Sequence, residues 1–321
     1  MNLWKEIKNR FLAIVWFYKM CHNKRIDFLS DGIWNDWNAQ PEDIFTPERL
    51  REIKKSLDLD SCCCIDNFIK SLSLDLKLRY LNFVLAKPTY TDRFKAEYHR
   101  YQKEEKKEFA TKGIPIPFEE SAYFHHGMRF LPESVKNYVK NKIFIDGGAC
   151  FGDSTLIFQK YSPKKVLAFD ISEKNADVFR KVMKKNHLSE ENVLLIQKGL
   201  GEKYEELSFE DGKGGSTTLD NSGKKKITII PLDACREIDS TVGWIKFDLE
   251  GFGLYAFRGM IETIKRDRPI LTLAVYHNPD EFFGIKKLLE SLNLNYKITF
   301  KACSFSEIYE LTLIAYPAEL E

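Results

Sequence analysis

The 321-residue chain has no apolar run long enough to cross a membrane. The run Phe11–Tyr18 has eight residues, whereas a membrane-spanning helix needs roughly 20. No small-residue cleavage site follows it, so we expect no secretory signal. Basic residues surround the run, and we expect it to form a helix packed on the protein's own core. The alternative is an amphipathic helix on a membrane surface, which would give weak peripheral contact.

The chain also lacks a strong charge imbalance and a disulfide framework. A net charge of +2 is too small to indicate electrostatic binding of DNA or RNA, so we expect no nucleic-acid partner. The seven cysteines are odd in number, and Cys62–Cys64 are consecutive, which indicates reduced thiols in a cytoplasmic protein. No Cys/His spacing suits zinc, and we expect no metal centre.

The amino-terminal third has helical periodicity and no glycine-rich loop. Thr46 followed by Pro47 is typical of a helix start, and residues 90–107 predict a long charged helix. Gly113–Pro117 is the clearest linker. We therefore expect a helical region at 1–120 and a second domain at 121–321. The first region could cover an acceptor site, form a homodimer or bind another partner, and the sequence does not choose among these.

The most informative segment is a strand that ends in a glycine-rich turn. The strand stops at Asp146, the turn contains Gly147, Gly148 and Gly152, and Asp153–Ser154 are good helix-starting residues. This pattern predicts a parallel strand joined to a helix around a nucleotide-like ligand. We expect the Asp146 carboxylate to point into the crevice, where an acid suits a cofactor with an amino group and a sulfonium. The alternative is an ordinary strand–turn–helix junction that contains glycines.

A second acid follows at the spacing expected of a ribose-binding residue. Asp170 ends the next apolar run, 24 residues after Asp146, and we expect it to accept hydrogen bonds from both ribose hydroxyls. Ile171 and, past the third strand, Gly199 are further expected cofactor contacts. The alternative for Asp170 is a helix cap, a role that Ser172 also suits.

Strands and helices alternate through the rest of the chain. This alternation predicts an α/β fold with a Rossmann-like, doubly wound, mainly parallel sheet, preceded by the helical region. The chain closes on two β-rich runs with no helix between them. The expected strands are 192–197, 244–248, 269–276, 296–301 and 310–316, and the expected helices are 255–266 and 280–292.

Four ordered motifs resemble those of the FkbM family of methyltransferases: Phe144–Ala149, Asp170, Lys246–Gly251 and Ala274–Asp280. The resemblance covers about residues 123 to 316. It implies a seven-stranded methyltransferase sheet with an antiparallel last strand, S-adenosylmethionine as cofactor, and mostly O-methylation of sugars in surface glycans or of secondary metabolites. The second strand ends in Phe-Asp-Ile-Ser where relatives often have Phe-Glu-Pro, so the acid reaches one methylene less far.

Methylation of a hydroxyl needs help with its proton, because the pKa of a hydroxyl lies near that of water, roughly 15.7. We expect His277 to be the base, because an imidazole near its usual pKa of roughly 6.5 is largely neutral at pH 7. Asp248 and Glu250 would face the same side of an extended chain. Asp248 could orient the hydroxyl or the cofactor's ammonium, and Glu250 could orient His277. The alternatives are a turn-stabilising His277 and a Mg²⁺ ion on the two carboxylates.

Three further residues are expected to contact the acceptor. His125 and His126 precede the first strand and could form a lid, with at most one of them serving the site directly. Tyr276 precedes His277. The alternative for the histidines is an incidental position in a loop. The glycine-serine segment 212–220 predicts a flexible turn within a β-hairpin, with contact to the substrate as the alternative.

These patterns predict an S-adenosylmethionine-dependent O-methyltransferase for a hydroxyl of a sugar or surface-glycan precursor. One alternative is a methyltransferase for a secondary metabolite, and another is a non-catalytic cofactor-binding scaffold. A nicotinamide dehydrogenase would need Gly-x-Gly-x-x-Gly directly after the strand, and a nucleobase methyltransferase usually has an Asn-Pro-Pro-Tyr-like run after strand four. The chain has neither at these places.

Overall fold

The computed structural model describes residues 37, 44–73, 101, 103, 106–116, 119–211, 217–219, 225–304 and 310–321. The expected helix at 11–18 lies outside these residues, as does most of the expected helix at 90–107. No helix in the described part of the chain is long and apolar enough to span a membrane.

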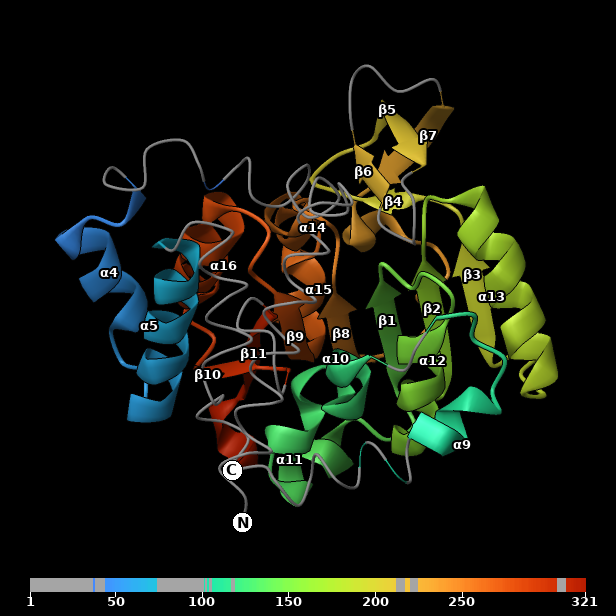
Figure 1. Ribbon diagram of the computed structural model, residues 1–321, viewed down its shortest axis with the longest axis horizontal. Coiled ribbons are helices and arrows are strands. Elements are labelled where there is room, and N and C mark those ends of the chain that lie inside the picture. The colour runs from blue at the N-terminus through green and yellow to red at the C-terminus, as the bar shows by residue number, and fades with distance from the viewer. Residues whose placement is uncertain are drawn as a thin grey trace, which may run out of the picture.

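A seven-stranded sheet forms the centre of the molecule, with strand order β10-β11-β9-β8-β1-β2-β3 (Figure 1). β11 runs antiparallel to both of its neighbours, and the pairs among β9, β8, β1, β2 and β3 are parallel. The predicted doubly wound sheet with an antiparallel last strand is therefore confirmed. The strands are β1 Ile143–Gly147, β2 Lys165–Phe169, β3 Val193–Ile196, β8 Val242–Phe247, β9 Ile270–Ala274, β10 Tyr296–Ala302 and β11 Leu311–Pro317.

Both faces of the sheet are covered, which explains why β1 and β8 are buried along their whole length. Alternate side chains of β1 enter different cores: Ile143 and Ile145 pack in one, and Phe144 packs in the other. The first core contains apolar residues of α5 (Leu59–Ser73), α14 (Gly253–Arg258), α15 (Ile261–Asp267) and α16 (Pro279–Ser291). The second contains those of α11 (Glu133–Tyr138), α12 (Asp153–Phe158) and α13 (Glu173–Lys185).

The predicted helix at 255–266 is wrong as one element, because the chain breaks between α14 and α15 at Gly259 and Met260. A Cβ atom on Gly259 would lie 1.9 Å from the carbonyl oxygen of Gly201. The two backbones touch here, so glycine is required at the position where α14 ends.

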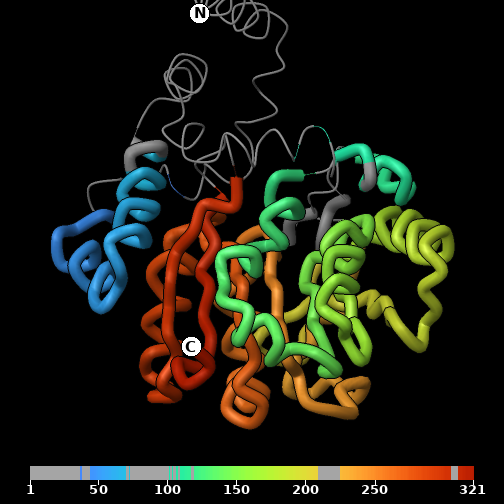
Figure 2. Tube along the Cα trace, turned by 90° about the horizontal axis from the view of Figure 1, so that it is seen from below, coloured from blue at the N-terminus to red at the C-terminus, as the bar shows by residue number. Residues whose placement is uncertain are grey.

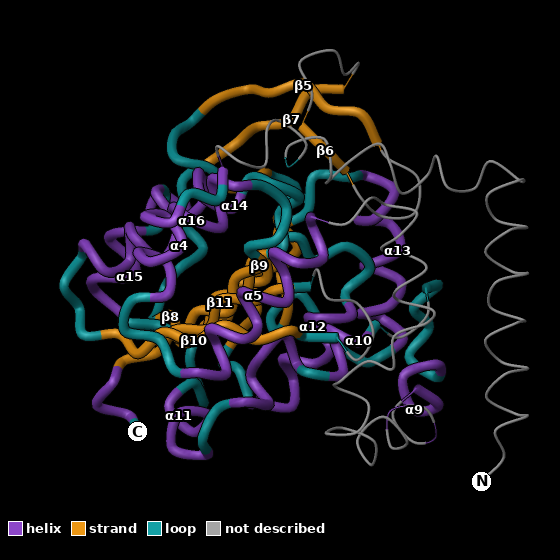
Figure 3. Tube along the Cα trace, turned by 60° about the vertical axis from the view of Figure 1, so that its left-hand side comes forward, coloured by secondary structure: helices purple, strands orange, loops and turns teal. Residues whose placement is uncertain are grey.

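A small second sheet lies between β3 and β8 in the sequence, in the order β4-β7-β5-β6. It stands apart from the central sheet, above the carboxyl ends of its parallel strands (Figure 3). Residues 217–219 of the expected turn form strand β6, so that part of the prediction is wrong, and 212–216 lie outside the described residues. The bounds are β4 Gly199–Leu200, β5 Glu205–Asp211, β6 Thr217–Leu219 and β7 Lys225–Ile230.

Helix α5 lies beside the edge strand β10, and α4 (Pro47–Lys54) packs against α5 and α16 (Figure 2). Thr46 caps α4 by accepting a hydrogen bond from the backbone N–H of Arg49, at 3.4 Å. From α5, the Ser61 hydroxyl accepts the N–H of Phe300 at 3.0 Å, which covers part of the exposed edge. The remaining short helices are α9 Lys106–Ala110, α10 Glu120–Tyr123, η2 His125–Phe130, η3 Gln159–Tyr161, η4 Leu232–Ala234 and η5 Ala318–Leu320.

Candidate active site

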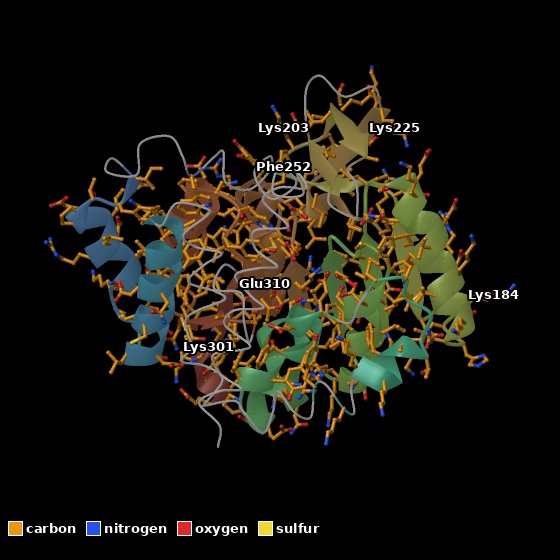
Figure 4. All side chains as sticks on the ribbon, in the orientation of Figure 1. Lys184, Lys203, Lys225, Phe252, Lys301 and Glu310 are labelled. Carbon is orange, nitrogen blue, oxygen red and sulfur yellow. The ribbon has the colours of Figure 1, made fainter. Side chains whose placement is uncertain are left out.

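A cavity of about 250 Å³ opens at the carboxyl ends of β1 and β8. In the sheet, β2 and β3 follow β1 on one side, whereas β8 and β9 lie on the other side of β1. The strand order therefore reverses between β1 and β8. Ligands of open α/β sheets bind at such a reversal of strand order. Phe252 belongs to the lining and lies at this edge of the sheet, beneath the small second sheet (Figure 4).

The glycine-rich turn after β1 forms one wall of the cavity. Gly148 has a φ of 74°, and a Cβ there would lie 1.9 Å from the carbonyl oxygen of Asp248. Glycine is therefore required for the two strand ends to touch. Gly152, with a φ of 91°, starts α12, and Asp153 in its first turn lines the cavity. Burial raises the pKa of Asp153 to about 6, against the lowering influence of Lys246.

Asp146 does not point into the crevice, so that prediction is wrong. Its carboxylate is fully buried and is not part of the cavity lining. The hydroxyls of Ser154 and Thr155 donate to it at 2.8 and 2.6 Å, because the first turn of α12 passes directly over it. Lys246 Nζ lies 3.3 Å from the same carboxylate. Asp146 and Ser154 therefore do not line the cavity, and they affect it only through the residues that they bind.

Lys246 is a site residue that the sequence reasoning missed. It lies within the buried strand β8, and its ammonium donates to the carbonyl oxygens of Gly147 and Gly148 at 3.2 and 2.9 Å. Burial opposes its charge, but the carboxylates of Asp146, Asp248 and Asp153 raise its pKa. A single lysine in an otherwise apolar strand was the available signal, since a buried charge needs a partner.

Asp170 connects the turns that follow β1 and β2. It accepts the N–H of Cys150 at 2.9 Å and that of Ser172 at 2.8 Å. Burial raises its pKa to about 6, although these hydrogen bonds act in the opposite direction. Asp170 lines the cavity together with Ile171 and Gly199, while Ser172 is the residue that caps α13.

His277 lies behind the cavity, between two carboxylates. It is 2% exposed and is absent from the lining; its Nδ1 is 2.8 Å from Glu281 and its Nε2 is 3.0 Å from Asp248. Burial acts to lower the pKa of His277, but Glu281 and Asp248 together hold it well above 6.5. The prediction that the imidazole faces the substrate is therefore wrong, and the surroundings of the ring favour its protonated form over the predicted neutral form.

The carboxylate that orients His277 Nδ1 is Glu281, whereas the prediction named Glu250. Glu250 lies 4.0 Å from Nε2 on the other side of the ring. Glu281 stands four residues after His277, in the first turn of α16, and it is fully buried. That spacing at a predicted helix start was the signal that could have found the pair.

Asp248 and Glu250 both line the cavity, with side chains 36% and 31% exposed. Burial would raise the pKa of Asp248, but the bond with His277 and the charge of Lys246 lower it well below 3.8. Burial raises the pKa of Glu250. Tyr276 donates to Asp248 at 3.4 Å from outside the lining, so it has no direct contact with the cavity.

The side chains of the two adjacent histidines, His125 and His126, lie in different surroundings. His126 lines the cavity, whereas Nδ1 of His125 lies 2.6 Å from the hydroxyl oxygen of Tyr161. Both histidines have a positive φ, near 50°, and Gly127 follows with a φ of 99°. Burial lowers the pKa of His125 to about 2 and that of His126 to about 3, so both rings are neutral at pH 7. Of the two, only His126 is in a position to contact a ligand in this cavity.

Acidic side chains therefore dominate the reactive part of the lining. The acids that face the cavity are Glu119, Asp153, Asp170, Asp248 and Glu250, and two lysines, Lys198 and Lys246, also line it. Among the described residues, no three His, Cys, Asp or Glu side chains are grouped so that they could hold a metal ion. The arrangement suits a cationic organic ligand that carries hydroxyl groups.

Comparison with known proteins gives three findings. A family model described as "Methyltransferase FkbM domain" matches residues 146–305. Methyltransferase FkbM from Methylobacillus flagellatus KT is similar in structure, with a TM-score of 0.54 and 19% identity over 88% of this chain. The match spans 61% of the length of that chain. A search of curated proteins finds no match.

Two more distant solved structures are also methyltransferases. An O-methyltransferase from Bacillus cereus in complex with SAH has a TM-score of 0.40 and 14% identity, covering 74% of this chain and 96% of its own. An rRNA methylase from Streptococcus thermophilus has a TM-score of 0.38 and 13% identity, covering 58% of this chain and 92% of its own.

Proposed function

Since the chain belongs to the FkbM methyltransferase family, we propose that it is an S-adenosylmethionine-dependent O-methyltransferase acting on a hydroxyl of a sugar or surface-glycan precursor. The observation that carries this proposal is the acidic cavity at the junction of β1 and β8. There a glycine turn allows close approach, and carboxylates face the space where the ligand would lie.

The residues present fit S-adenosylmethionine. Asp170 would accept the ribose hydroxyls, with Ile171 and Gly199 beside the nucleoside. Gly148 would allow the backbone to approach the methionine part, and Asp153 would face its ammonium group. Asp146 contributes indirectly, because it holds Lys246 against the glycine turn. When bound, the cofactor supplies an electrophilic methyl group on a positively charged sulfur.

The acidic lining is the reason to propose this donor. A sulfonium and an ammonium give the donor two positive centres, which the carboxylates of Asp153 and Asp248 would stabilise at short range. Lys246 offsets part of this charge and prevents mutual repulsion of the acids. A dinucleotide, with its anionic pyrophosphate, would meet the opposite electrostatic environment.

A hydroxyl acceptor is supported by the groups beside the strand end. Asp248 and Glu250 offer carboxylate oxygens on the cavity side, and such oxygens accept hydrogen bonds from hydroxyl groups. Positioning of this hydroxyl in line with the methyl group would supply much of the acceleration. His126, neutral and facing the same cavity, is a further candidate contact for the acceptor.

The test combines binding and transfer. Calorimetry with S-adenosylmethionine should show binding by the full chain, and labelled methyl groups should then appear in the carbohydrate fraction of an extract from the source organism. Label in a low-molecular-weight lipophilic fraction would instead indicate a secondary-metabolite acceptor. Binding with no transfer to any fraction would indicate a non-catalytic scaffold, and absence of binding would refute the proposal.

A further inference from the structure

His277 and Glu250 both lie beside Asp248, but they have different access to the ligand. On the buried side, His277 lies 3.0 Å from the Asp248 carboxylate, and on the open side Glu250 lines the cavity. Glu250 remains 31% exposed, against 2% for His277. A molecule in the cavity can therefore touch Asp248 and Glu250, whereas His277 lies outside the lining, with its Nε2 3.0 Å from Asp248 and 4.0 Å from Glu250.

Both ring nitrogens of His277 lie close to carboxylates, Nδ1 in a hydrogen bond and Nε2 at ion-pair distance without the alignment of a hydrogen bond. Nδ1 is 2.8 Å from Glu281, and Nε2 is 3.0 Å from Asp248. A histidine between two carboxylates holds a proton on each nitrogen, and a ring in that state has no lone pair to accept another. Its role is then to hold Asp248 in place, which makes it a positioning residue.

The loop that carries Glu250 is fixed by the start of α16. The side-chain amide of Asn278 donates to the carbonyl oxygen of Gly251 at 2.9 Å. The second carboxylate oxygen of Glu281 accepts the N–H of Gly253 at 2.7 Å. Glu281 therefore anchors His277 with one oxygen and the Glu250 loop with the other.

The backbone at Glu250 is strained. Its φ is 49°, in the left-handed region that residues other than glycine rarely adopt, and Gly251 follows with a φ of 97°. Such a conformation costs on the order of 1–3 kcal/mol and persists only where surrounding contacts impose it. The contacts from Asn278 and Glu281 do so here, and the result is a carboxylate presented to the cavity.

We propose that Glu250 is the general base of the methyl transfer and that His277, held by Glu281, is a positioning residue for Asp248. The proposal rests on the proposed function. The acceptor O–H bond breaks and its proton passes to a Glu250 carboxylate oxygen. The acceptor oxygen forms its bond to the methyl carbon as the carbon–sulfur bond of the sulfonium donor breaks, and that electron pair stays on sulfur.

The charges around Glu250 agree with this role. Asp248 and Lys246 face it from β8, and His277 and Glu281 face it from the end of β9 and the start of α16. Burial and the two neighbouring carboxylates raise the pKa of Glu250 above 4.5, whereas His277 and Lys246 act in the opposite direction. Glu250 is thus a stronger base than Asp248, whose pKa is lowered.

The transfer test compares Glu250→Gln and Glu250→Asp with the wild type, using the carbohydrate fraction as acceptor. General-base loss predicts a drop in kcat of about 10²–10⁴-fold for Glu250→Gln, with S-adenosylmethionine affinity within about twofold by calorimetry. Glu250→Asp should recover part of the rate. The matched control is Asp280→Asn, which alters an exposed carboxylate in the first turn of α16 and should leave the rate unchanged. A Glu250→Gln rate within about threefold of wild type would overturn the proposal.

A second measurement needs no acceptor. Nuclear magnetic resonance of the full chain should show His277 doubly protonated at pH 7, assigned by its loss in His277→Asn, and Glu250 titrating above its ordinary range. Glu281→Gln should shift the His277 titration downward, and Asp280→Asn should not. A His277 that titrates near 6.5 would overturn the proposal. Failure of the wild type to transfer methyl groups would count against the proposed function, while this titration would still decide the proton positions.

Discussion

The two sides of the cavity handle charge differently. On the β1 side, Asp146 is fully buried and is bound by two hydroxyls and one ammonium, all within the protein. On the β8 side, Asp248 and Glu250 keep about a third of their surface open to the ligand. The first arrangement stabilises a rigid turn, and the second leaves carboxylate oxygens available for chemistry.

The difference follows from what each strand end must do. The glycine turn after β1 must hold its backbone against the end of β8, and Lys246 bonds to two of its carbonyl oxygens. The loop after β8 must present side chains, and it is held from behind by Asn278 and Glu281. Preorganisation on both sides comes from buried charges. Asp153 lines the cavity beside the turn after β1, and Asp248 and Glu250 line it beside β8.

Removal of Lys246 should give the largest effect. Lys246→Met leaves the buried Asp146 without its cation, and loss of one member of a buried pair costs about 3 kcal/mol or more. The free energy of unfolding, measured in urea, should fall by that order, whereas Lys265→Met on the exposed face of α15 should change it by less than about 0.5 kcal/mol. The double variant Asp146→Asn, Lys246→Met should recover part of the loss. Equal stability of Lys246→Met and wild type would show that the β1 side does not depend on this pair.

Asp170→Asn should weaken S-adenosylmethionine binding by about 10–100-fold, since hydrogen bonds to a charged group contribute about 1.5–3 kcal/mol. Affinity of the wild type should also fall as the pH drops below about 6, where the carboxylate takes up a proton. The variant should lose the part of this pH dependence that comes from Asp170 and keep the part that comes from Asp153, whose pKa is also raised to about 6. Calorimetry across pH 5 to 8 checks both, with Asp177→Asn on the exposed face of α13 as control. A wild-type affinity that is flat over this range would remove Asp170 from the ribose site.

His277 should make stability depend on pH in a defined direction. Its folded pKa is raised above 6.5, so its ion pairs contribute fully below pH 6.5. Above that pH the unfolded chain loses the proton first, and each pH unit removes up to about 1.4 kcal/mol until the folded pKa is passed. The difference in unfolding free energy between wild type and His277→Asn should therefore shrink as the pH rises. A constant difference for His277→Asn would contradict its imidazolium state.

The smallest effect is expected from a chelator. If Glu250 removes the proton, EDTA should leave methyl transfer within about twofold of its starting rate. Loss of activity with EDTA and recovery with Mg²⁺ would instead favour the interpretation in which Asp248 and Glu250 hold a divalent ion. The transfer assay with and without Mg²⁺ distinguishes the two.

Much of the site could be predicted because it depends on strand ends. Parallel strands place their carboxyl ends along one edge, so Asp170, Asp248 and Glu250 could be assigned to a common crevice from the sequence. Gly148 and Gly152 could be recognised as positions with unusual backbone conformations. The direction of a single side chain could not be predicted in this way, as Asp146 shows.

The errors share one physical cause. Asp146 turns inward because α12 places two hydroxyls over it, and the pKa of His277 is raised because Glu281 and Asp248 meet at its ring. At the break between α14 and α15, Gly259 contacts a backbone nearly 60 residues earlier in the chain. Each depends on groups brought together from separate elements, and no local pattern records such a meeting.

The amino-acid sequence alone determined the order of strands and helices, the glycine turn and the acids at the strand ends, because periodicity and backbone preference are local properties. Tertiary structure alone decided which acid is neutralised, which faces the ligand and whether the histidine is charged. Those outcomes depend on burial and on distances between charges, and both exist only after the sheet and its helices have assembled.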